Sequence, residues 1–194
     1  MGSPFIRGGT AGQGAGVKFT ETRLSGAFVV EPELIKDDRG FFARSFCRQE
    51  FARLGLVGEF VQNNVSFNAT KGTLRGLHYQ SDPFPETKLV RCTMGRIFDV
   101  IVDIRPQSRS YSQWFAIELS ARNRLALYVP AGFAHGFMTL ADDCEVFYQM
   151  SEYYHPDCTG SVLWSDPGIG VEWPAGPSIV SAKDAASPSL MDLR

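Results

Sequence analysis

The feature of this sequence that most constrains its fold is a series of short runs in which apolar and polar residues alternate. The run at 96–104 is apolar at both its odd and its even positions, which is typical of a central strand covered on both faces. The other runs alternate with period two, as half-buried antiparallel strands do. The strands predicted from this pattern include 27–30, 40–46, 60–66, 96–104, 115–119 and 125–129.

Turn residues separate these runs, as at Lys71-Gly72, Met94-Gly95 and Arg105-Pro106. Short strands and turns at regular spacing favour an all-β sandwich or barrel. Two short helices are predicted, at 48–54 and 182–186.

Domain organisation is predicted to be simple. Residues 22–194 show no internal repeat, no linker and no change of composition, and we expect one domain there. The start of the chain is rich in Gly and lacks the apolar run of a secretory signal. We therefore expect residues 1–21 to be a flexible arm or a cloning remnant.

Charge and hydropathy narrow the possible partners and location. The net charge of −2 provides no bulk attraction for nucleic acid or an anionic membrane. No apolar stretch approaches the roughly 18 residues that span a bilayer. The four cysteines have no CxxC or disulfide-framework spacing, so we expect reduced thiols in a cytoplasmic protein that binds neither nucleic acid nor membrane.

Two of the three histidines, His78 and His135, lie in segments dense with Gly and charge. The spacing Pro130-x-Gly132-x-x-His135 resembles the second signature of the cupins, in which a turn directs a histidine into the mouth of a barrel. The first cupin signature contains His-x-His, whereas this chain has Gln80 two residues after His78.

A metal site is therefore not expected. First-row metals in proteins usually have three protein ligands, and these segments offer only His78, Glu86 and His135. The alternative is a purely structural role, in which the histidines are hydrogen-bonded polar residues of a small core. Neither a metal nor another cofactor is predicted.

Cationic residues on the same strands favour an anionic ligand. Arg75, Lys88 and Arg91 need either an exit to solvent or an anion, because an unpaired charge is costly to bury. Strand alternation places Lys88 on the same face as the apolar Val90 and Cys92, so we expect its ammonium to point inward.

Alternation leaves two points open. Tyr148 shares a face with apolar neighbours, so it is either a core tyrosine with a bonded hydroxyl or a group in the site. Arg75 and His78 are three residues apart and should face opposite sides. They face the same side only if Gly76 forms a bulge.

Motifs along almost the whole chain, from about residue 22 to 191, resemble those of the dTDP-4-dehydrorhamnose 3,5-epimerases. The matching segments are 38–42, 60–64, 71–80, 88–91, 98–105, 130–137, 153–154, 163–166, 168–174 and 181–185, in the family's order. The resemblance implies a metal-independent cupin-type jelly roll, a homodimer, and a nucleoside diphosphate 4-keto-6-deoxyhexose as substrate, with a dTDP sugar favoured.

The resemblance also implies roles for individual residues. The substrate ketone acidifies the hydrogens at C3 and C5, so a positioned base can remove one and leave an enolate. His78 matches the family base and Asp184 the carboxylate that orients it. Lys88 matches the cation near the C4 oxygen, and Tyr148 the acid that returns a proton from the opposite face.

Further positions match the family's substrate-binding residues. These are Arg39, Gln62, Asn64, Arg75, His135, Lys183 and a nucleotide-stacking tyrosine, Tyr154 or its neighbour Tyr153. Two positions depart from the family, because Arg44 and Thr159 stand where it usually has glutamate. We expect these departures to affect the choice of nucleotide or sugar rather than proton transfer.

Three alternatives stay open at this stage. A related epimerase that inverts C3 alone would need the same four catalytic groups. A metal-dependent cupin oxygenase is disfavoured by Gln80 in place of a histidine ligand. A non-catalytic sugar-binding cupin is disfavoured because binding alone does not need an acid, a base and a cation together.

Overall fold

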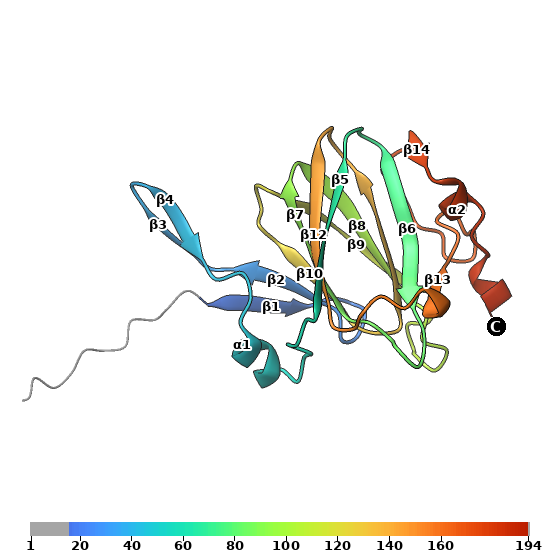
Figure 1. Ribbon diagram of the computed structural model, residues 1–194, viewed down its shortest axis with the longest axis horizontal. Helices are drawn as coiled ribbons and strands as arrows, with labels where there is room; N and C mark the ends of the chain where they lie inside the picture. The colour runs from blue at the N-terminus through green and yellow to red at the C-terminus, as the bar shows by residue number, and fades with distance from the viewer. Residues whose placement is uncertain (1–15, 194) are drawn as a thin grey trace, which may run out of the picture.

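Two β-sheets packed face to face form the body of the molecule, whose computed structural model describes residues 16–193 (Figure 1). The strands of the first sheet are, in order, β1 (Val17–Glu21), β2 (Phe28–Pro32), β10 (Ala126–Val129), β7 (Lys88–Met94), β12 (Cys144–Met150) and β5 (Gln62–Asn68). Those of the second are β13 (Thr159–Ser161), β6 (Thr73–Gln80), β11 (Phe133–Thr139), β8 (Arg96–Asp103) and β9 (Trp114–Ser120), and β14 (Ile179–Val180) pairs with β6. The predicted all-β sandwich is confirmed.

The main core lies between the two sheets. Val90 and Val146 of the first sheet and Ile97 and Ile101 of the second are fully buried there. Each such side chain stabilises the fold by about 1.5–3 kcal/mol relative to an exposed one. The other face of β8 is buried as well, through Val100 and its neighbours, under the C-terminal segment. The prediction of a central strand covered on both faces is therefore confirmed.

The helix α1 (Arg48–Arg53) covers part of the outer face of the first sheet. Its one buried residue, Phe51, lies with its ring centroid 4.9 Å from that of Phe19 on β1 and 5.8 Å from that of Tyr128 on β10. The aromatic cluster fixes the helix to the sheet, and the predicted helix at 48–54 is confirmed to within one residue.

The C-terminal segment crosses the outer side of the second sheet and holds the second helix, α2 (Ala182–Ala185), close to β6 (Figure 1). Ser181 caps this helix, because its Oγ accepts a hydrogen bond of 3.0 Å from the Asp184 N–H. The predicted helix at 182–186 is thus confirmed. Two 3₁₀ turns complete the segment, η1 (Pro156–Cys158) and η2 (Leu190–Leu193).

The predicted N-terminal arm at 1–21 is wrong at its C-terminal end. Val17–Glu21 form β1, which pairs with β2 along its whole length. The Val17 N–H also donates a hydrogen bond of 2.9 Å to the Glu50 carboxylate. The strand was missed because five residues of alternation beside a Gly-rich run are a weak signal, and their partners lie elsewhere in the sequence. Residues 1–15 of the predicted arm lie outside the described part of the chain.

A hairpin of β3 (Leu34–Asp37) and β4 (Gly40–Ala43) projects from the body of the molecule (Figure 1). The predicted strand at 40–46 therefore ends at Ala43, and the chain then turns back towards α1.

One strand of the second sheet carries an extra residue near Gly76. His78 pairs with His135 and Arg75 with Phe137, so three steps along β6 match two along β11. Gly76 has a φ of 125°, and a Cβ there would lie 2.6 Å from the backbone of β11, so only glycine fits. The bulge that the sequence left open is therefore present, and it allows Arg75 and His78 to face the same side.

Two further expectations, on membrane spans and on the cysteines, can be compared with residues 16–193. No helix within 16–193 is long and apolar enough to cross a membrane. Cys92 and Cys144 are buried, Cys47 and Cys158 are partly buried, and all four are free thiols as predicted. Burial raises the pKa of the Cys92 thiol to about 12, which keeps it protonated and unreactive.

Candidate active site

A cavity of about 400 Å³ opens between the two sheets, with walls from β5, β6, β7, β12 and the C-terminal segment. Most of the side chains predicted for catalysis or substrate binding line it. The lining residues are Gln62, Asn64, His78, Tyr79, Gln80, Glu86, Lys88, Tyr148, Met150, Tyr154, Thr159 and Lys183.

The histidine of this cavity is paired with a buried carboxylate. His78 Nε2 lies 2.7 Å from Asp184 Oδ1, and the Asp184 side chain is only 6% exposed. The other carboxylate oxygen of Asp184 accepts a hydrogen bond of 3.2 Å from the Gly76 N–H. This arrangement fixes the ring, and a proton on Nε2 leaves Nδ1 as the nitrogen that can accept another.

The electrostatic surroundings keep the His78 ring neutral. Burial lowers its pKa below the ordinary 6.5, and this outweighs the opposing effect of Asp184. Electrostatic interactions with Lys88 and His135 lower the pKa of His78 further. A neutral imidazole at neutral pH is the form that can act as a base.

Lys88 points into the cavity, as strand alternation predicted. Its side chain is 11% exposed, and its Nζ lies 2.7 Å from Glu86 Oε1. The ammonium is therefore partly desolvated and held in place, which strengthens its effect on any negative charge that develops nearby.

Tyr148 faces the same cavity from the opposite sheet. It lies on β12 of the first sheet, whereas His78 lies on β6 of the second. Burial raises the pKa of the Tyr148 hydroxyl, the charge of Glu86 raises it further, and Arg75 partly offsets the rise. The phenol thus stays protonated and can donate a proton from the wall that faces the base.

Several predicted binding residues lie at the cavity in contact with one another. The Asn64 amide donates to the Met150 sulfur at 3.0 Å, and Gln62 accepts a hydrogen bond of 3.2 Å from the Tyr154 N–H. Lys183 reaches the lining from α2, next to Asp184 in the sequence. Polar groups of β5 and the loop after β12 therefore form one side of the entrance.

His135 and Arg75 were predicted to bind substrate, but neither belongs to the cavity lining. His135 is paired with His78 across the two strands, and its Nε2 lies 2.9 Å from the buried Asp99 Oδ1. Arg75 Nε donates a hydrogen bond of 2.7 Å to Asn68 Oδ1. Arg75 lies on β6, a strand of the cavity wall, and His135 on the neighbouring strand β11, so both are close to the cavity without lining it.

Arg39 was also predicted to bind substrate, and a single chain does not bring it to this cavity. It lies at the tip of the β3–β4 hairpin, paired with Asp37, far from β6 (Figure 1). The sequence could not show this, because the hairpin extends away from the sheet that its neighbours join.

The two departures from the family pattern lie in different places. Arg44 lies beside α1, where its Nη1 is 2.9 Å from Glu50 Oε1. Thr159 lines the cavity, and its hydroxyl donates to the His155 carbonyl at 3.1 Å. Within one chain, only Thr159 is placed to affect substrate choice.

We expect the substitution Arg44→Glu to lower the free energy of unfolding by about 1–3 kcal/mol. It replaces the partner of the partly buried Glu50 with a second carboxylate, so attraction becomes repulsion. Urea unfolding monitored by circular dichroism measures the change. Arg44→Met removes only the attraction and should show a smaller loss. Equal stability of wild type and Arg44→Glu would contradict the structural role of the pair.

Sequence reasoning missed two acidic groups near the site. Glu86 was considered only as a metal ligand, although it lies two residues before Lys88 and is near enough in sequence to pair with it. Asp99 is fully buried beside His135, and a charged residue in a strand apolar on both faces was the available signal. Glu86 faces Lys88, and Asp99 faces His135, rather than solvent.

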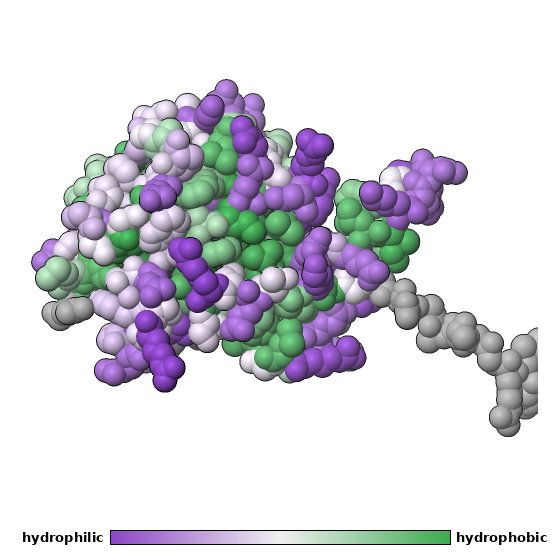
Figure 2. All heavy atoms as spheres, turned by 180° about the vertical axis from the view of Figure 1, so that it is seen from behind, coloured by the Kyte–Doolittle hydropathy of each residue, from purple (hydrophilic) through white to green (hydrophobic). Residues whose placement is uncertain are grey.

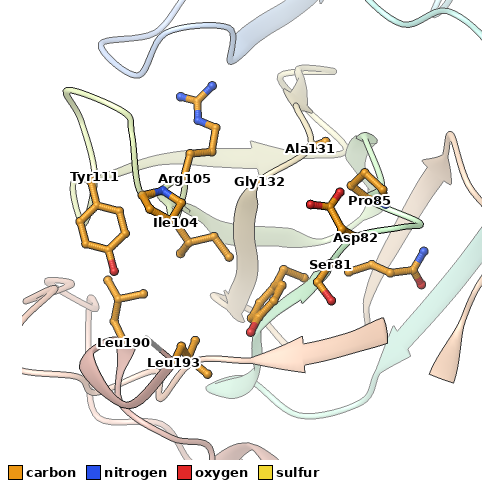
Figure 3. Close-up of a pocket in the computed structure, with 13 residues that line it drawn as sticks. Ser81, Asp82, Pro85, Ile104, Arg105, Tyr111, Ala131, Gly132, Leu190 and Leu193 are labelled. Atoms are coloured by element: carbon orange, nitrogen blue, oxygen red, sulfur yellow. The ribbon is translucent and has the colours of Figure 1, made fainter. Parts of the chain in front are cut away.

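A larger cavity of about 790 Å³ lies beside the outer face of the second sheet (Figure 3). Apolar groups such as Ile104, Leu190 and Leu193 form its walls, and its described lining includes no histidine or lysine. Arg105 is tied to Asp103 by a hydrogen bond of 2.7 Å. The histidine, the two lysines and Tyr148 thus belong to the smaller cavity.

Comparison with known proteins agrees with this site. Residues 21–192 match the family model of dTDP-4-dehydrorhamnose 3,5-epimerase. A relative of that name from Salmonella typhimurium is 46% identical over 88% of this chain and 93% of its own length.

Solved structures give the same result. The dTDP-4-dehydrorhamnose 3,5-epimerase of Bacillus anthracis, solved with TDP and PPi bound, is 44% identical, with a TM-score of 0.87 over 90% of this chain and 99% of that one. A 3′-monoepimerase from Streptomyces bikiniensis, in complex with dTDP-quinovose, is 31% identical, with a TM-score of 0.82 over 88% and 86%. The predicted cupin-type jelly roll is confirmed, and the chain belongs to the dTDP-4-dehydrorhamnose 3,5-epimerase family.

Proposed function

We propose that this protein inverts C3 and C5 of a dTDP-4-keto-6-deoxyhexose by proton abstraction and return. One observation carries the proposal: a histidine–aspartate pair and a protonated tyrosine face one cavity from opposite sheets, and a lysine lines the same cavity. Inversion requires removal of a proton from one face of a carbon and its return to the other face, which this geometry supports.

In the proposed reaction, neutral His78 removes the proton from the carbon next to the ketone. Asp184 stabilises the imidazolium that forms. The electron pair moves to the C4 oxygen as an enolate, whose charge the Lys88 ammonium stabilises. Tyr148 then delivers a proton to the opposite face of the same carbon. Exchange with solvent reprotonates Tyr148 and deprotonates His78 before the second centre reacts.

The surroundings of Gln80 support a reaction without a metal. Its side-chain amide donates to the carbonyls of Phe84 and Tyr153 at 2.6 and 3.0 Å, and its oxygen accepts from the His155 N–H at 2.9 Å. These bonds hold the loops around the cavity, so Gln80 acts as a structural residue where a metal-dependent cupin has a ligand. Elemental analysis of the purified protein is expected to find no stoichiometric metal.

The entrance of the cavity suits the nucleotide part of the substrate. Tyr154 and its neighbour Tyr153 are more than half exposed there, so either ring is available to stack on a base. Lys183 lines the cavity, and Arg75 lies near Tyr148, which places positive charge close to a diphosphate. The free thiols agree with a reducing compartment, and we propose that the enzyme works in the cytoplasm.

The proposal further includes a homodimer. Along the edge strand β5, Asn63, Val65 and Phe67 point outward, and the two apolar side chains among them, Val65 and Phe67, are 60% and 51% exposed. The projecting hairpin exposes Phe41 and Phe42 as well, and Figure 2 shows apolar residues gathered on the hairpin and on the neighbouring surface. Such surfaces are usual at an interface between subunits. A partner could then bring its own Arg39 to the site.

We expect Val65→Asp combined with Phe67→Asp to convert the dimer into a monomer. Two carboxylates would have to be desolvated at the interface, whereas both side chains are already in water on a single chain. Sedimentation equilibrium gives the mass of each form. A wild-type protein that sediments as a monomer of 21.5 kDa would contradict the proposed dimer.

The pKa shifts of the two proton-transfer groups predict the pH profile. Because His78 acts neutral and its pKa is lowered, kcat/KM should fall on the acid side only below pH 6.5. Because Tyr148 acts protonated and its pKa is raised, kcat/KM should fall on the alkaline side only above pH 10.0. Initial rates between these limits measure the plateau. An acid limb centred above pH 6.5 would contradict the buried, neutral His78.

A panel of nucleotide 4-keto-6-deoxy sugars, followed by NMR in deuterium oxide, tests the proposal as a whole. With the dTDP sugar, we expect deuterium at both C3 and C5 of the epimerised product. Deuterium at C3 alone would identify the protein as a monoepimerase. Faster turnover of the CDP, GDP or UDP form would overturn the proposed nucleotide, and no turnover of any form would overturn the proposed activity.

A further inference from the structure

We propose that Glu86 is a substrate-binding residue whose Oε2 accepts a hydrogen bond from the hydroxyl on C3 of the sugar. This inference rests on the function proposed above and adds a recognition contact to it. The side chain of Glu86 is only 8% exposed, and it lines the cavity together with His78, Lys88 and Tyr148. Its Oε1 is bound to Lys88 Nζ, while its Oε2 is buried and has no hydrogen-bond partner among the described residues.

A buried carboxylate oxygen without a donor is unfavourable, because it has lost water and gained nothing in return. Two donors that line the same cavity are engaged elsewhere: the Asn64 amide donates to Met150, and the Thr159 hydroxyl donates to a backbone carbonyl. Lys88 already serves Oε1. A hydrogen-bond donor that enters the cavity with the substrate would satisfy Oε2.

The chemistry of the substrate limits what this donor can be. A diphosphate carries no donor and would be repelled by the carboxylate. A 4-keto-6-deoxyhexose has lost the hydroxyls at C4 and C6, so C2 and C3 carry the hydroxyls that remain on the nucleotide-linked ring. The geometry favours C3, because Lys88 is assigned to the C4 oxygen and the same ammonium lies 2.7 Å from Glu86.

The contact would also serve the reaction. A carboxylate that holds Lys88 by one oxygen and the C3 hydroxyl by the other orients the ketone and the ammonium towards each other. It would therefore discriminate against sugars that lack this hydroxyl, since such ligands leave Oε2 buried and unpaired.

Isothermal titration calorimetry with stable ligands tests the contact without turnover. The ligands are dTDP, dTDP-glucose and its 2-deoxy and 3-deoxy analogues, and the variants are Glu86→Met and Glu86→Gln. Wild type should bind dTDP-glucose about 10- to 100-fold more tightly than the 3-deoxy analogue, as expected for a hydrogen bond to a charged group. In Glu86→Met, which has similar size but no oxygen, this ratio should fall to about two or less.

Three readouts keep the result specific. Affinity for dTDP measures separately how loss of the carboxylate charge affects binding of the nucleotide part, and the ratio for the 2-deoxy analogue should match wild type in both variants, because that ratio does not depend on the C3 hydroxyl. Glu86→Gln should show an intermediate 3-deoxy ratio, since a neutral amide oxygen is a weaker acceptor. This variant also supplies the test if Glu86→Met does not fold.

Two outcomes separate this inference from the function on which it rests. A full wild-type 3-deoxy ratio in the folded variants would overturn the role of Glu86 and leave the epimerase intact. Failure of wild type to bind dTDP-glucose would overturn the proposed substrate class, and the Glu86 contact with it.

Discussion

Substituting His78 with asparagine is expected to lower the rate of proton removal from the sugar by about 10²–10⁴-fold. His78 is the histidine that lines the cavity, and its neutral ring is oriented by Asp184 at 2.7 Å. Asparagine keeps a polar group of similar length but cannot accept and hold a proton at neutral pH. Deuterium wash-in at C3 and C5, followed by NMR, measures the rate directly.

His155→Asn provides a matched control for this experiment. It makes the same chemical change in a ring that is stacked on Phe84 outside the cavity lining. We expect wash-in by this variant to stay close to that of wild type. Wash-in by a folded His78→Asn protein within about threefold of wild type would remove His78 as the base, since general-base catalysis is worth far more.

Tyr148→Phe is expected to separate proton exchange from inversion. The substitution removes the hydroxyl that faces the cavity from the first sheet, while His78 and Asp184 on the other side are unchanged. The enolate can still form, but proton return to the opposite face loses its acid. We therefore expect formation of the epimerised product to fall by about 10²-fold or more, while exchange at the sugar partly survives.

The exchange reaction is the internal control for Tyr148→Phe, because it reports that the variant still folds, binds and ionises the substrate. If exchange and inversion both stayed at wild-type rates, Tyr148 would be a core residue with a bonded hydroxyl. If both fell equally, the hydroxyl would be needed to form the enolate rather than to complete the inversion.

Much of the fold could be predicted because the burial of a strand is visible in its pattern of apolar residues. The run at 96–104 is apolar on both faces since β8 lies between the main core and the layer under the C-terminal segment. Val17–Glu21 and the true extent of the hairpin could not be predicted. These strands are short. Tertiary contacts, rather than local alternation, determine where β1 pairs and where the hairpin ends.

Some features of the site could likewise be predicted from the sequence, whereas others could not. Alternation placed Lys88 inward, whereas it left open whether Gly76 forms a bulge, which the register of β6 and β11 shows. Nothing local could pair His78 with Asp184, because 106 residues separate them, and only the family resemblance joined them. Glu86 was overlooked as a partner of Lys88, although only one residue separates the two in the sequence.

The central claim is that protons leave one face of the sugar through His78 and return to the other through Tyr148. The isotope content of product and recovered substrate, at low conversion in deuterium oxide, tests it most directly. We predict that each centre inverted by wild type carries a solvent deuterium in the product, because Tyr148 exchanges with solvent and does not hold the proton taken by His78. In Tyr148→Phe we predict deuterium mainly in recovered, uninverted substrate. Product that keeps its original hydrogen at an inverted centre would mean that one group both removes and returns the proton, and would contradict the account.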